Sequence, residues 1–473
     1  MKRIIRVLPL FLLLLVAPAV FADLAPAGGG EYVFERYANC LTPEARADIQ
    51  SRIDANVAVL RAEGRLLEES SKKVFMEWPL AAAPSYTHYG FHAVSGFVDQ
   101  NLAPGTLDWN CGAITYDGHM GTDYYLWPFD WNLVAQDAVH VVAGMRGVIT
   151  LKDDGYPDTS CDWVTNPNWN AVYVQHADNS VAWYGHMKSG SLTAKSVGDT
   201  VETGEYLGVV ASSGVSTGPH LHLEMKRGNG TLIDPYAGPC NGTTAGTWWA
   251  SQPPYYDSGI NALMTHDAPL QWQACPNQHV TNEENFFGAG STVYTAAYYR
   301  DQLAAQNTVY TIYRPDNSIW QTWNHASGAS HYSSSYWYWT WNLPASPQEG
   351  WWKFEAVYEG GTYEHSFVVG NPTAVAAGDA VPRADRLSAH PNPFNPSTTI
   401  TYVLAEPGHL AIDVFDARGA LVRTLVDREA RAGEGSVVWN GSDARGASVP
   451  SGTYFARYRG NGEEETQKIV LLR

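Results

Sequence analysis

The stretch SSGVSTGPHLHLEM, residues 212–225, decides the fold and contains the most informative pair of residues in the chain. Its first half is rich in Gly and Ser, as in a turn, and its second half alternates histidine with leucine, as in a strand. Side chains two apart on a strand point to the same face of a sheet. We therefore expect His220 and His222 to lie side by side, where two imidazoles can approach one metal ion.

Two segments upstream carry polar side chains whose spacing suits a metal site. The string DGHMGTDYYLWPFD, residues 117–130, contains His119 and Asp123, and the string WYGHMKSG, residues 183–190, contains His186. A catalytic zinc commonly takes three protein ligands from His, Asp, Glu or Cys and keeps a fourth position open. As ligands the chain offers His119, Asp123 and one histidine of the pair in residues 220–222. The other histidine of that pair and His186 are then left for proton transfer.

In this order the motifs resemble the lysostaphin-type zinc metalloendopeptidases, which cut peptide bridges in bacterial cell walls. The resemblance rests on four strings between residues 118 and 236, namely GHMGTD, WYGHM, VGDTVETGEYLGVVASSGVSTGPHLHLEM and DPY. It implies one Zn²⁺ ion with three ligands, which are His119, Asp123 and His222. The segment LWPFDWNLVAQDAVH, residues 126–140, is longer than the short turn typical of the family, so the rim of the cleft differs.

The resemblance also implies catalytic roles for His186 and His220. Zinc lowers the pKa of water to about 7, so that hydroxide can attack the scissile carbonyl at neutral pH. An imidazole can take the water proton and later protonate the leaving amine, because its pKa lies near the operating pH. The sequence leaves open which histidine is acid and which is base.

Tyr184 is a candidate for stabilising the developing oxyanion. It precedes His186 by two residues, so on a strand it would share the face of that histidine. Its hydroxyl could then donate a hydrogen bond to the negative charge that forms during the reaction. A half-buried aromatic residue of a strand is an equal alternative for this position.

The first 22 residues have the three parts of a secretory signal. They comprise a positively charged start, an apolar run over residues 7–20 and the small-residue ending VFA. The apolar run is short for a membrane span and contains Pro18. We expect cleavage after Ala22 and a soluble mature protein that is secreted, either extracellular or at the cell surface.

Charge and composition narrow the set of partners. Lys and Arg number 30 against 48 Asp and Glu, which gives a net charge of −18. Nucleic-acid binding needs a basic face, so we expect no nucleic-acid partner. The 18 Trp and 27 Tyr residues can stack on sugars or fill the cores of β-sandwiches, and the second use is favoured. We expect a monomer.

Five cysteines in an exported chain are expected to form disulfides. Our first prediction pairs Cys111 with Cys161 at the rim of the cleft, and Cys240 with Cys275 at the end of the catalytic domain. Cys40 is then left without a partner. Other pairings stay open, because sequence alone does not choose between them.

The sequence predicts a mainly β protein with a short helical N-terminal segment. Residues 23–75 contain a helical pattern that Thr42 can cap. Residues 76–250 have β-branched and aromatic runs between Gly-rich turns, which predicts an antiparallel β-sheet metallopeptidase domain. Residues 255–370 alternate as in a β-sandwich (Ig-like) accessory domain. Within it Trp337, Trp339 and Trp341 share one strand face, either as core or as a binding platform.

The end of the sequence predicts a linker followed by a second β-sandwich (Ig-like) domain. The linker is residues 371–385 and the domain is residues 386–473. The strings PNPFNPSTTI, WNGSDARG and PSGTYF resemble the C-terminal sorting domains of type IX secretion substrates and the related Ig-like domain of flagellar hook scaffold proteins. The resemblance implies outer-membrane secretion machinery as a partner. A plain accessory domain is the alternative.

These observations predict an exported zinc endopeptidase that hydrolyses peptide bonds in peptidoglycan cross-links or bridges. A Gly-rich protein is an alternative substrate for the same residues. Two readings from other classes stay open: a catalytically silent module that binds cell wall or activates a partner, and a sugar-binding surface adhesin. As a further hypothesis, residues 23–75 mask the cleft before maturation.

Overall fold

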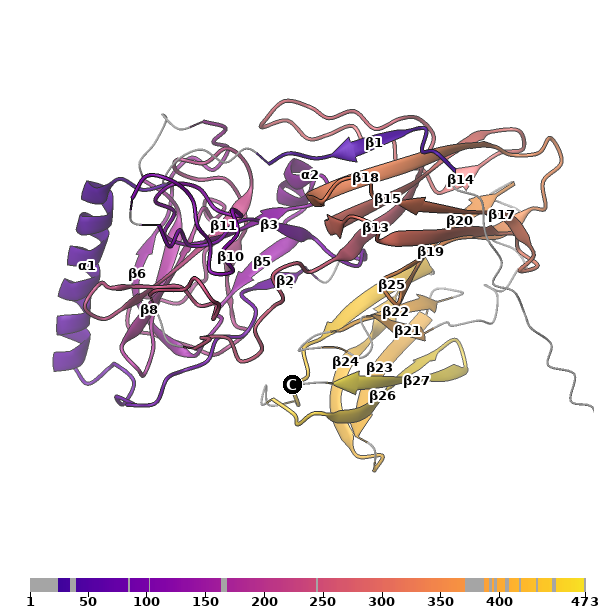
Figure 1. The fold of residues 1–473 in the computed structure, drawn as a ribbon. Coiled ribbons are helices and arrows are strands. Elements are labelled where there is room, and N and C mark those ends of the chain that lie inside the picture. Colours follow the sequence, from indigo (N-terminus) through magenta and orange to yellow (C-terminus); the bar gives the residue numbers. More distant parts are fainter. Residues whose placement is uncertain are drawn as a thin grey trace, which may run out of the picture.

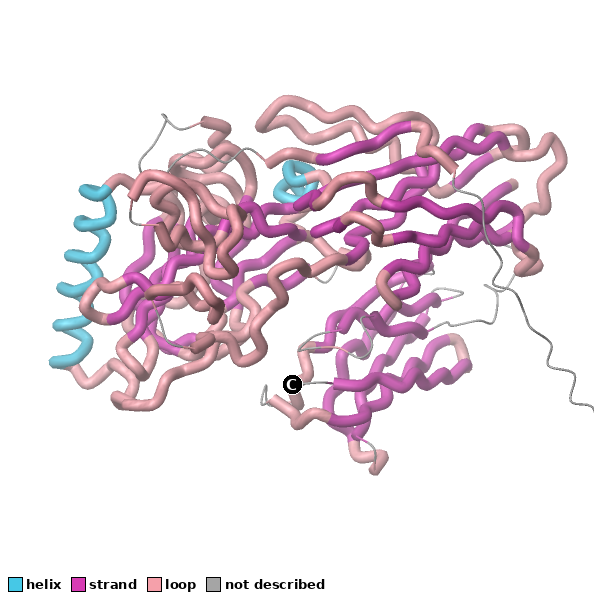
Figure 2. The backbone as a smooth tube through the Cα atoms, in the orientation of Figure 1, coloured by secondary structure: helices cyan, strands magenta, loops and turns pink. Residues whose placement is uncertain are grey.

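The computed structural model describes residues 24–471 with short internal gaps (Figure 1). The gaps are residues 35–39, 84–85, 102, 163–167, 244–245, 371–386, 391–393, 395–397, 405–407, 417, 431–432 and 445–447. The predicted signal peptide, residues 1–22, and the predicted linker, residues 371–385, lie outside the described residues. The described chain is mainly β, as predicted, and Figure 2 shows strands throughout all three parts of the molecule.

Helix α1 (Pro43–Ala62) lies at one end of the molecule, beside the first large sheet (Figure 1). The Thr42 side chain accepts a hydrogen bond from the Ala45 amide at 3.2 Å, so the helix begins with the predicted cap. Its buried side chains include Ile49 and Ile53, which pack in one cluster with Trp183 of the sheet. The N-terminal segment is therefore a packed part of the structure.

The first domain is built on an eight-stranded sheet whose paired strands are antiparallel. Along the sheet the strands are β3 (His92–Gly96), β4 (Thr122–Leu126), β11 (His220–Arg227), β8 (Ser180–Gly185), β7 (Ala171–Gln175), β6 (Gly147–Asp153) and β9 (Thr200–Val201), with β12 (Leu232–Ile233) beside β11.

A second, three-stranded sheet belongs to the same domain. Its strands are β10 (Tyr206–Val209), β5 (Val139–Val142) and β2 (Leu80–Ala82). Side chains of β11 alternate between two environments: Leu221, Leu223 and Met225 join the main hydrophobic core, which also contains residues of β5 and β10. His220, His222 and Glu224 therefore share the opposite face.

The long segment after β4 joins the first domain to the second. It contains the short helix α2 (Asp130–Ala135). Trp127 and Phe129 are buried in a cluster with Ala262 and Tyr298 of the second domain. The indole of Trp127 donates a hydrogen bond to the Tyr299 carbonyl at 2.9 Å. The long segment over residues 126–140 thus connects the two domains.

The second domain is a β-sandwich of two sheets, as predicted. The first sheet contains β1 (Gly28–Glu31), β18 (His331–Asn342), β15 (Thr292–Leu303) and β13 (Gly259–His266). The second contains β14 (Phe286–Phe287), β20 (Gly361–Val369), β19 (Gly350–Tyr358), β16 (Asn307–Tyr313) and β17 (Ile319–Ala326).

Two features of this sandwich bear on the sequence predictions. Strand β1 comes from the N-terminal segment, for which the sequence predicted a helix and did not indicate this strand. Trp339 is 2% exposed, and Trp337 and Trp341 are partly buried against the same core. The tryptophan row is therefore core rather than an open binding platform.

The third domain is a smaller sandwich with its own core. Its strands are β21 (Leu387–His390), β22 (Thr398–Leu404) and β25 (Gly433–Trp439) in one sheet, and β24 (Leu421–Ala430), β23 (Gly408–Asp416), β26 (Gly452–Gly460) and β27 (Glu463–Leu471) in the other. Among all described residues, no helix is long and apolar enough to cross a membrane.

The disulfide pairing differs from our first prediction. Cys111 is bonded to Cys240, and Cys161 to Cys275, while Cys40 is free as expected. The prediction paired cysteines that are near in sequence, whereas the folded chain brings distant loops together. The Cys240 amide, for example, donates a hydrogen bond to the Trp109 carbonyl at 3.0 Å, which sets this cysteine beside the loop of Cys111.

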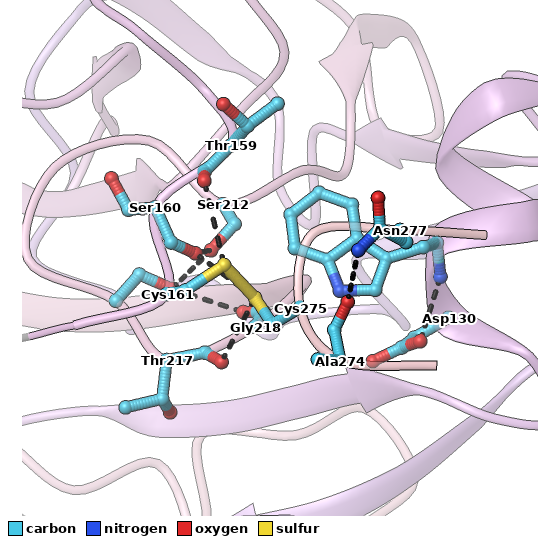
Figure 3. Close-up of a disulfide and its surroundings, with 12 residues drawn as sticks. Asp130, Thr159, Ser160, Cys161, Ser212, Thr217, Gly218, Ala274, Cys275 and Asn277 are labelled. Carbon is cyan, nitrogen blue, oxygen red and sulfur yellow. Dashed lines mark hydrogen bonds between the residues drawn. A yellow bond between two sulfur atoms is a disulfide. The ribbon is translucent and has the colours of Figure 1, made fainter. Parts of the chain in front are cut away.

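The second disulfide supports the loop that leads into β11 (Figure 3). Next to Cys161, Ser160 and Ser212 exchange two hydrogen bonds of 2.9 and 2.7 Å. On the other side, the Sγ atom of Cys275 lies 3.7 Å from the Thr217 carbonyl oxygen. The disulfide thus ties the loop between β6 and β7, which lies beside the approach to β11, to the loop that follows β13 in the second domain.

Candidate metal centre

Strands β4 and β11 bring three predicted ligands together on one face of the sheet. Asp123 lies directly opposite His222 in the antiparallel register, and His119 comes just before β4. The Nδ1 atom of His222 is 2.8 Å from Asp123 Oδ1 and 3.3 Å from His119 Nε2. The Nε2 atom of His119 is 3.2 Å from Asp123 Oδ2. All three side chains are buried.

This donor set fits a zinc ion. One ligand atom from each of His119, Asp123 and His222 lies within 4.8 Å of the other two. Zinc bonds of about 2.0–2.1 Å in a tetrahedron place two ligand nitrogens about 3.3 Å apart. The observed nitrogen separation of 3.3 Å agrees with this value. Two imidazoles and a carboxylate are also a ligand set of catalytic zinc sites, which keep one position open.

Each of these two histidines is held by its other ring nitrogen. The Nδ1 atom of His119 donates to the Phe97 carbonyl oxygen at 2.8 Å, because a carbonyl can only accept. Its Nε2 atom therefore has a free lone pair. The Nε2 atom of His222 lies 3.4 Å from the Glu224 carboxylate, which turns Nδ1 toward Asp123. Such partners commonly fix the tautomer and orientation of metal-binding histidines.

The two predicted catalytic histidines are held in the same way. The Nδ1 atom of His186 donates to the Ser213 carbonyl oxygen at 2.6 Å, and Nδ1 of His220 donates to the Gly218 carbonyl oxygen at 2.9 Å. Their ring centroids are 4.2 Å apart. Nε2 of His220 lies 3.7 Å from Asp123 Oδ1. Within the described part of the chain, Nε2 of His186 has no hydrogen-bond partner.

The charges of the cluster follow from burial and from close contacts. Burial raises the pKa of Asp123, but His119, His220 and His222 outweigh it and hold that pKa well below its usual value. Burial lowers the pKa of both His186 and His220, so their free nitrogens tend to be unprotonated. The cluster therefore combines an ionised carboxylate with imidazoles that can accept protons.

The opposite shift occurs at His222. Burial lowers its pKa, but the charges of Cys40 and Asp123 outweigh burial and raise it well above the usual value. A negative environment around a buried imidazole favours a cation at this point, either a proton or a metal ion.

Three residues that support the site were not found from the sequence. The Tyr116 hydroxyl donates to Asp123 Oδ2 at 2.9 Å, and its ring stacks on His119 with centroids 4.1 Å apart. Glu224 sits beside His222 and pairs in the core with Arg46 of α1. The alternation His220, His222, Glu224 could have revealed Glu224, whereas nothing near Arg46 in sequence points to the site.

Tyr184 does not join this cluster. Its hydroxyl accepts a hydrogen bond from the Gly144 amide at 2.9 Å, and its ring is fully buried in the main core. Strand alternation does not extend from Tyr184 to His186, because β8 ends at Gly185 and His186 adopts a left-handed backbone with φ of 61°. The chain thus turns between them, and the structure gives Tyr184 a packing role instead of the predicted oxyanion role.

Family models match two parts of the chain. Residues 132–235 match peptidase family M23, and residues 395–459 match the FlgD Ig-like domain. These matches agree with the β-sheet metallopeptidase domain and the final Ig-like domain described above. The first match contains His186, His220 and His222 and supports a peptidase domain of family M23 in this part of the chain. It begins after His119 and Asp123.

Known relatives match a part of the chain as well. The chain is 34% identical over 123 residues to the DD-carboxypeptidase/endopeptidase Mpg of Neisseria meningitidis serogroup B, and equally to that of Neisseria gonorrhoeae. This segment is 26% of the chain and spans 23% of the length of those relatives. The likeness therefore covers a small part of each protein.

Two solved structures are similar to parts of the chain. One is the catalytic domain of the prophage-encoded M23 protein EnpA from Enterococcus faecalis, with 27% identity and a TM-score of 0.18, covering 30% of this chain and 88% of that one. The other is a zinc-containing peptidase from Vibrio cholerae, with 19% identity and a TM-score of 0.22, covering 34% of this chain and 39% of that one.

Proposed function

We propose that residues 76–250 form a zinc-dependent endopeptidase that hydrolyses a peptide bond in bacterial peptidoglycan cross-links or bridges. One observation carries this proposal. Each of the four histidines of the centre has one ring nitrogen fixed by a carbonyl or carboxylate group. In His119, His220 and His222 the other nitrogen lies 2.8–3.7 Å from Asp123. In His186 it has no hydrogen-bond partner among the described residues. Four such anchors favour a preorganised reaction centre over a chance gathering of buried histidines.

In this proposal His119, Asp123 and His222 hold the metal through Nε2, a carboxylate oxygen and Nδ1. A bound zinc ion would polarise the scissile carbonyl and make water nucleophilic at neutral pH. Glu224 and the Phe97 carbonyl would keep the two ligand imidazoles in place. Two imidazoles and one carboxylate favour zinc, and a catalytic zinc site keeps its fourth coordination position open.

His186 and His220 would move the protons. Both present an Nε2 lone pair, because Nδ1 of each is occupied in donating to a carbonyl. One imidazole would take a proton from the attacking water, and the adjacent one would protonate the leaving amine or stabilise the charge that develops. The two rings are close enough to act on one substrate, and the assignment of acid and base between them stays open.

The proposal also includes the substrate of the enzyme and the location of the protein in or outside the cell. Peptidoglycan is favoured because residues 132–235 match a peptidase family and the relatives carry the name carboxypeptidase/endopeptidase. A Gly-rich protein is the alternative substrate. We propose that the protein is secreted, since it contains two disulfides and a signal-like start. The C-terminal domain would then serve export through type IX machinery.

The test is mass spectrometry of fragments released from purified peptidoglycan by the mature chain, with His186→Ala as the matched variant. Walls with direct cross-links and walls with Gly bridges should both be used. New amino termini that appear with the mature chain and vanish with His186→Ala are expected, and they would identify the bond. Zinc-loaded protein that releases no fragments from either wall, even after removal of residues 23–75, would reject the proposed substrate.

A further inference from the structure

The two proposed proton-transfer histidines both depend on one segment, residues 212–219, which leads into β11. Nδ1 of His186 donates to the Ser213 carbonyl oxygen at 2.6 Å, and Nδ1 of His220 donates to the Gly218 carbonyl oxygen at 2.9 Å. We call residues 212–219 the anchor segment, because its two carbonyl groups set the direction of both imidazoles. Anything that holds this segment in place therefore acts on both histidines.

Serine hydroxyls stabilise the anchor segment from within. Ser212 and Ser216 are buried, and their Oγ atoms lie 2.7 Å apart. Ser216 Oγ is also 2.9 Å from the Gly218 carbonyl oxygen, the acceptor that holds His220. Ser212 donates in turn to the Ser160 carbonyl oxygen at 2.7 Å. Since Ser160 directly precedes a disulfide-bonded cysteine, these contacts connect the His220 anchor with that disulfide.

A loop of the second domain holds the anchor segment from outside. It is the β13–β14 loop, residues 267–285, and it contains Cys275, which is bonded to Cys161. The Sγ atom of Cys275 lies 3.7 Å from the Thr217 carbonyl oxygen, as Figure 3 shows. The disulfide therefore meets the anchor segment one residue before the Gly218 carbonyl group.

The β13–β14 loop reaches the anchor segment by a second route, through α2. His279 accepts a hydrogen bond from the Gln273 amide at Nδ1, so its Nε2 atom carries the proton and donates to Asp130 Oδ1 at 2.8 Å. This pair is buried. The other oxygen of Asp130 lies against Gly218, since a Cβ atom added at Gly218 would be 3.8 Å from Asp130 Oδ2. Two side chains of one loop thus hold the anchor segment at neighbouring residues.

The Cys111–Cys240 disulfide provides a comparison. It joins the loops before β4 and after β12, both within the first domain. Its cysteines are 129 residues apart in sequence, against 114 for Cys161 and Cys275. Bridges that close loops of similar length restrict the unfolded chain to a similar degree. The two bridges are therefore matched in their general effect on stability, and they differ in the part of the fold that they hold.

We propose that the second domain is a positioning part of the enzyme, because its β13–β14 loop holds the anchor segment through Cys275 and His279 and so directs both proton-transfer histidines. The inference rests on the proposed function, which assigns proton transfer to these histidines. A misplacement of about 1 Å in a reacting group can lower a rate by about 10²-fold. A loop that keeps two carbonyl acceptors in place therefore contributes to turnover as well as to stability.

Removal of each disulfide in turn from the mature full chain tests the proposal. The Cys161→Ser/Cys275→Ser chain should keep about one zinc ion and lose about 10–100-fold in kcat on a soluble peptidoglycan fragment, with little change in KM. The Cys111→Ser/Cys240→Ser chain is the matched control, and its kcat should equal that of the unaltered chain below its unfolding transition. If the first chain does not fold, the control chain decides: a phosphine reductant should open its remaining bridge and lower kcat, and reoxidation should restore it.

Magnetic resonance of chains with isotope-labelled histidine adds a readout that does not depend on turnover. The imidazole nitrogen signals report which ring nitrogen carries the proton, and His186→Ala and His220→Ala assign them. In the unaltered chain both histidines should carry the proton on Nδ1, as their carbonyl acceptors require. Loss of the Cys161–Cys275 bridge should weaken these two signals, whereas loss of the other bridge should leave them unchanged.

The outcomes separate the two proposals. Equal kcat with and without the Cys161–Cys275 bridge, or equal losses after removal of either bridge, would overturn the positioning role and leave the proposed function intact. A zinc-loaded unaltered chain that turns over no substrate would overturn the proposed function instead. The histidine signals then still decide the positioning role, because they need no turnover: signals that survive the loss of the Cys161–Cys275 bridge would overturn it.

Discussion

The N-terminal segment and the C-terminal domain lie at the two ends of the described chain, and they relate differently to the sheet that carries the candidate metal centre. The N-terminal segment shares buried contacts with the site, through Cys40 beside His222 and Arg46 on Glu224. The C-terminal domain has a core of its own side chains, such as Ile412 and Trp439. A part that shares the site's buried contacts can control the site, whereas a self-contained domain can be lost without changing it.

The largest effect is expected at the centre that the N-terminal segment contacts. His186→Ala should lower turnover by about 10²–10⁴-fold, as is typical when a general acid or base is removed, and should keep the zinc. His176→Ala is the matched control: His176 is also buried, its Nδ1 also bonds a carbonyl and its Nε2 also lacks a partner among the described residues, but it belongs to neither metal-binding group. Steady-state kinetics and zinc content check both variants. Loss of zinc from His186→Ala would show that its role was assigned wrongly.

The second prediction concerns how tightly the N-terminal helix is bound to the site. Arg46→Met should cost up to about 3–5 kcal/mol in the free energy of unfolding, because the buried Glu224 carboxylate then keeps only Lys226, at 3.1 Å, as a cationic partner. Arg52→Met on the same helix should cost about 0–1 kcal/mol, since Arg52 is 41% exposed in its pair with Asp153. Denaturant unfolding measures both. Equal losses would mean that the ion pair of Arg46 does not fasten the segment.

Truncations at each end of the chain test the difference between the C-terminal domain and the N-terminal segment. Removing residues 371–473 should leave zinc content and turnover on small peptide substrates unchanged, because the C-terminal domain packs on its own core. Removing residues 23–75 should change turnover, since this deletion takes away the Cys40 thiol beside His222 and the Arg46 ion pair. A chain without its C-terminal domain that loses activity would contradict the distinction between the two flanking parts.

The smallest effect on turnover is expected for Tyr184→Phe. The change removes the acceptor of the Gly144 amide and should cost about 1–3 kcal/mol of stability. Turnover of the folded enzyme should stay the same, because the hydroxyl is directed into the core. An oxyanion role would instead reduce turnover by about 10²–10³-fold. Kinetics below the unfolding transition therefore decide between the packing role and the oxyanion role.

Much of the fold and of the centre could be predicted from local sequence. The alternation of histidine and leucine in residues 220–223 sets the two imidazoles on one face, and the structure has them there on β11. Helix α1 begins at the predicted cap, Thr42. These predictions succeed because strand alternation and helix capping depend on residues close together in sequence.

The features that could not be predicted from the sequence depend on which segments, far apart in the chain, lie together in the fold. Nothing in the sequence around Cys40 or Arg46 indicates that they lie beside β11, since this follows from how α1 packs on the sheet. The cysteine pairing was wrong for the same reason, because loops far apart in sequence meet in space. Tyr184 was placed wrongly because the left-handed backbone at His186 ends the alternation of β8.

The metal centre is tested most directly by the zinc content of the dialysed mature chain, measured together with that of Asp123→Ala. Asp123 is the only carboxylate in the three-ligand group that the described residues form. The unaltered protein is expected to bind about one zinc ion per chain, and the variant is expected to lose nearly all of its zinc. A dialysed mature chain that binds no zinc, or an Asp123→Ala variant that holds zinc as firmly as the unaltered protein, would contradict the proposed metal centre.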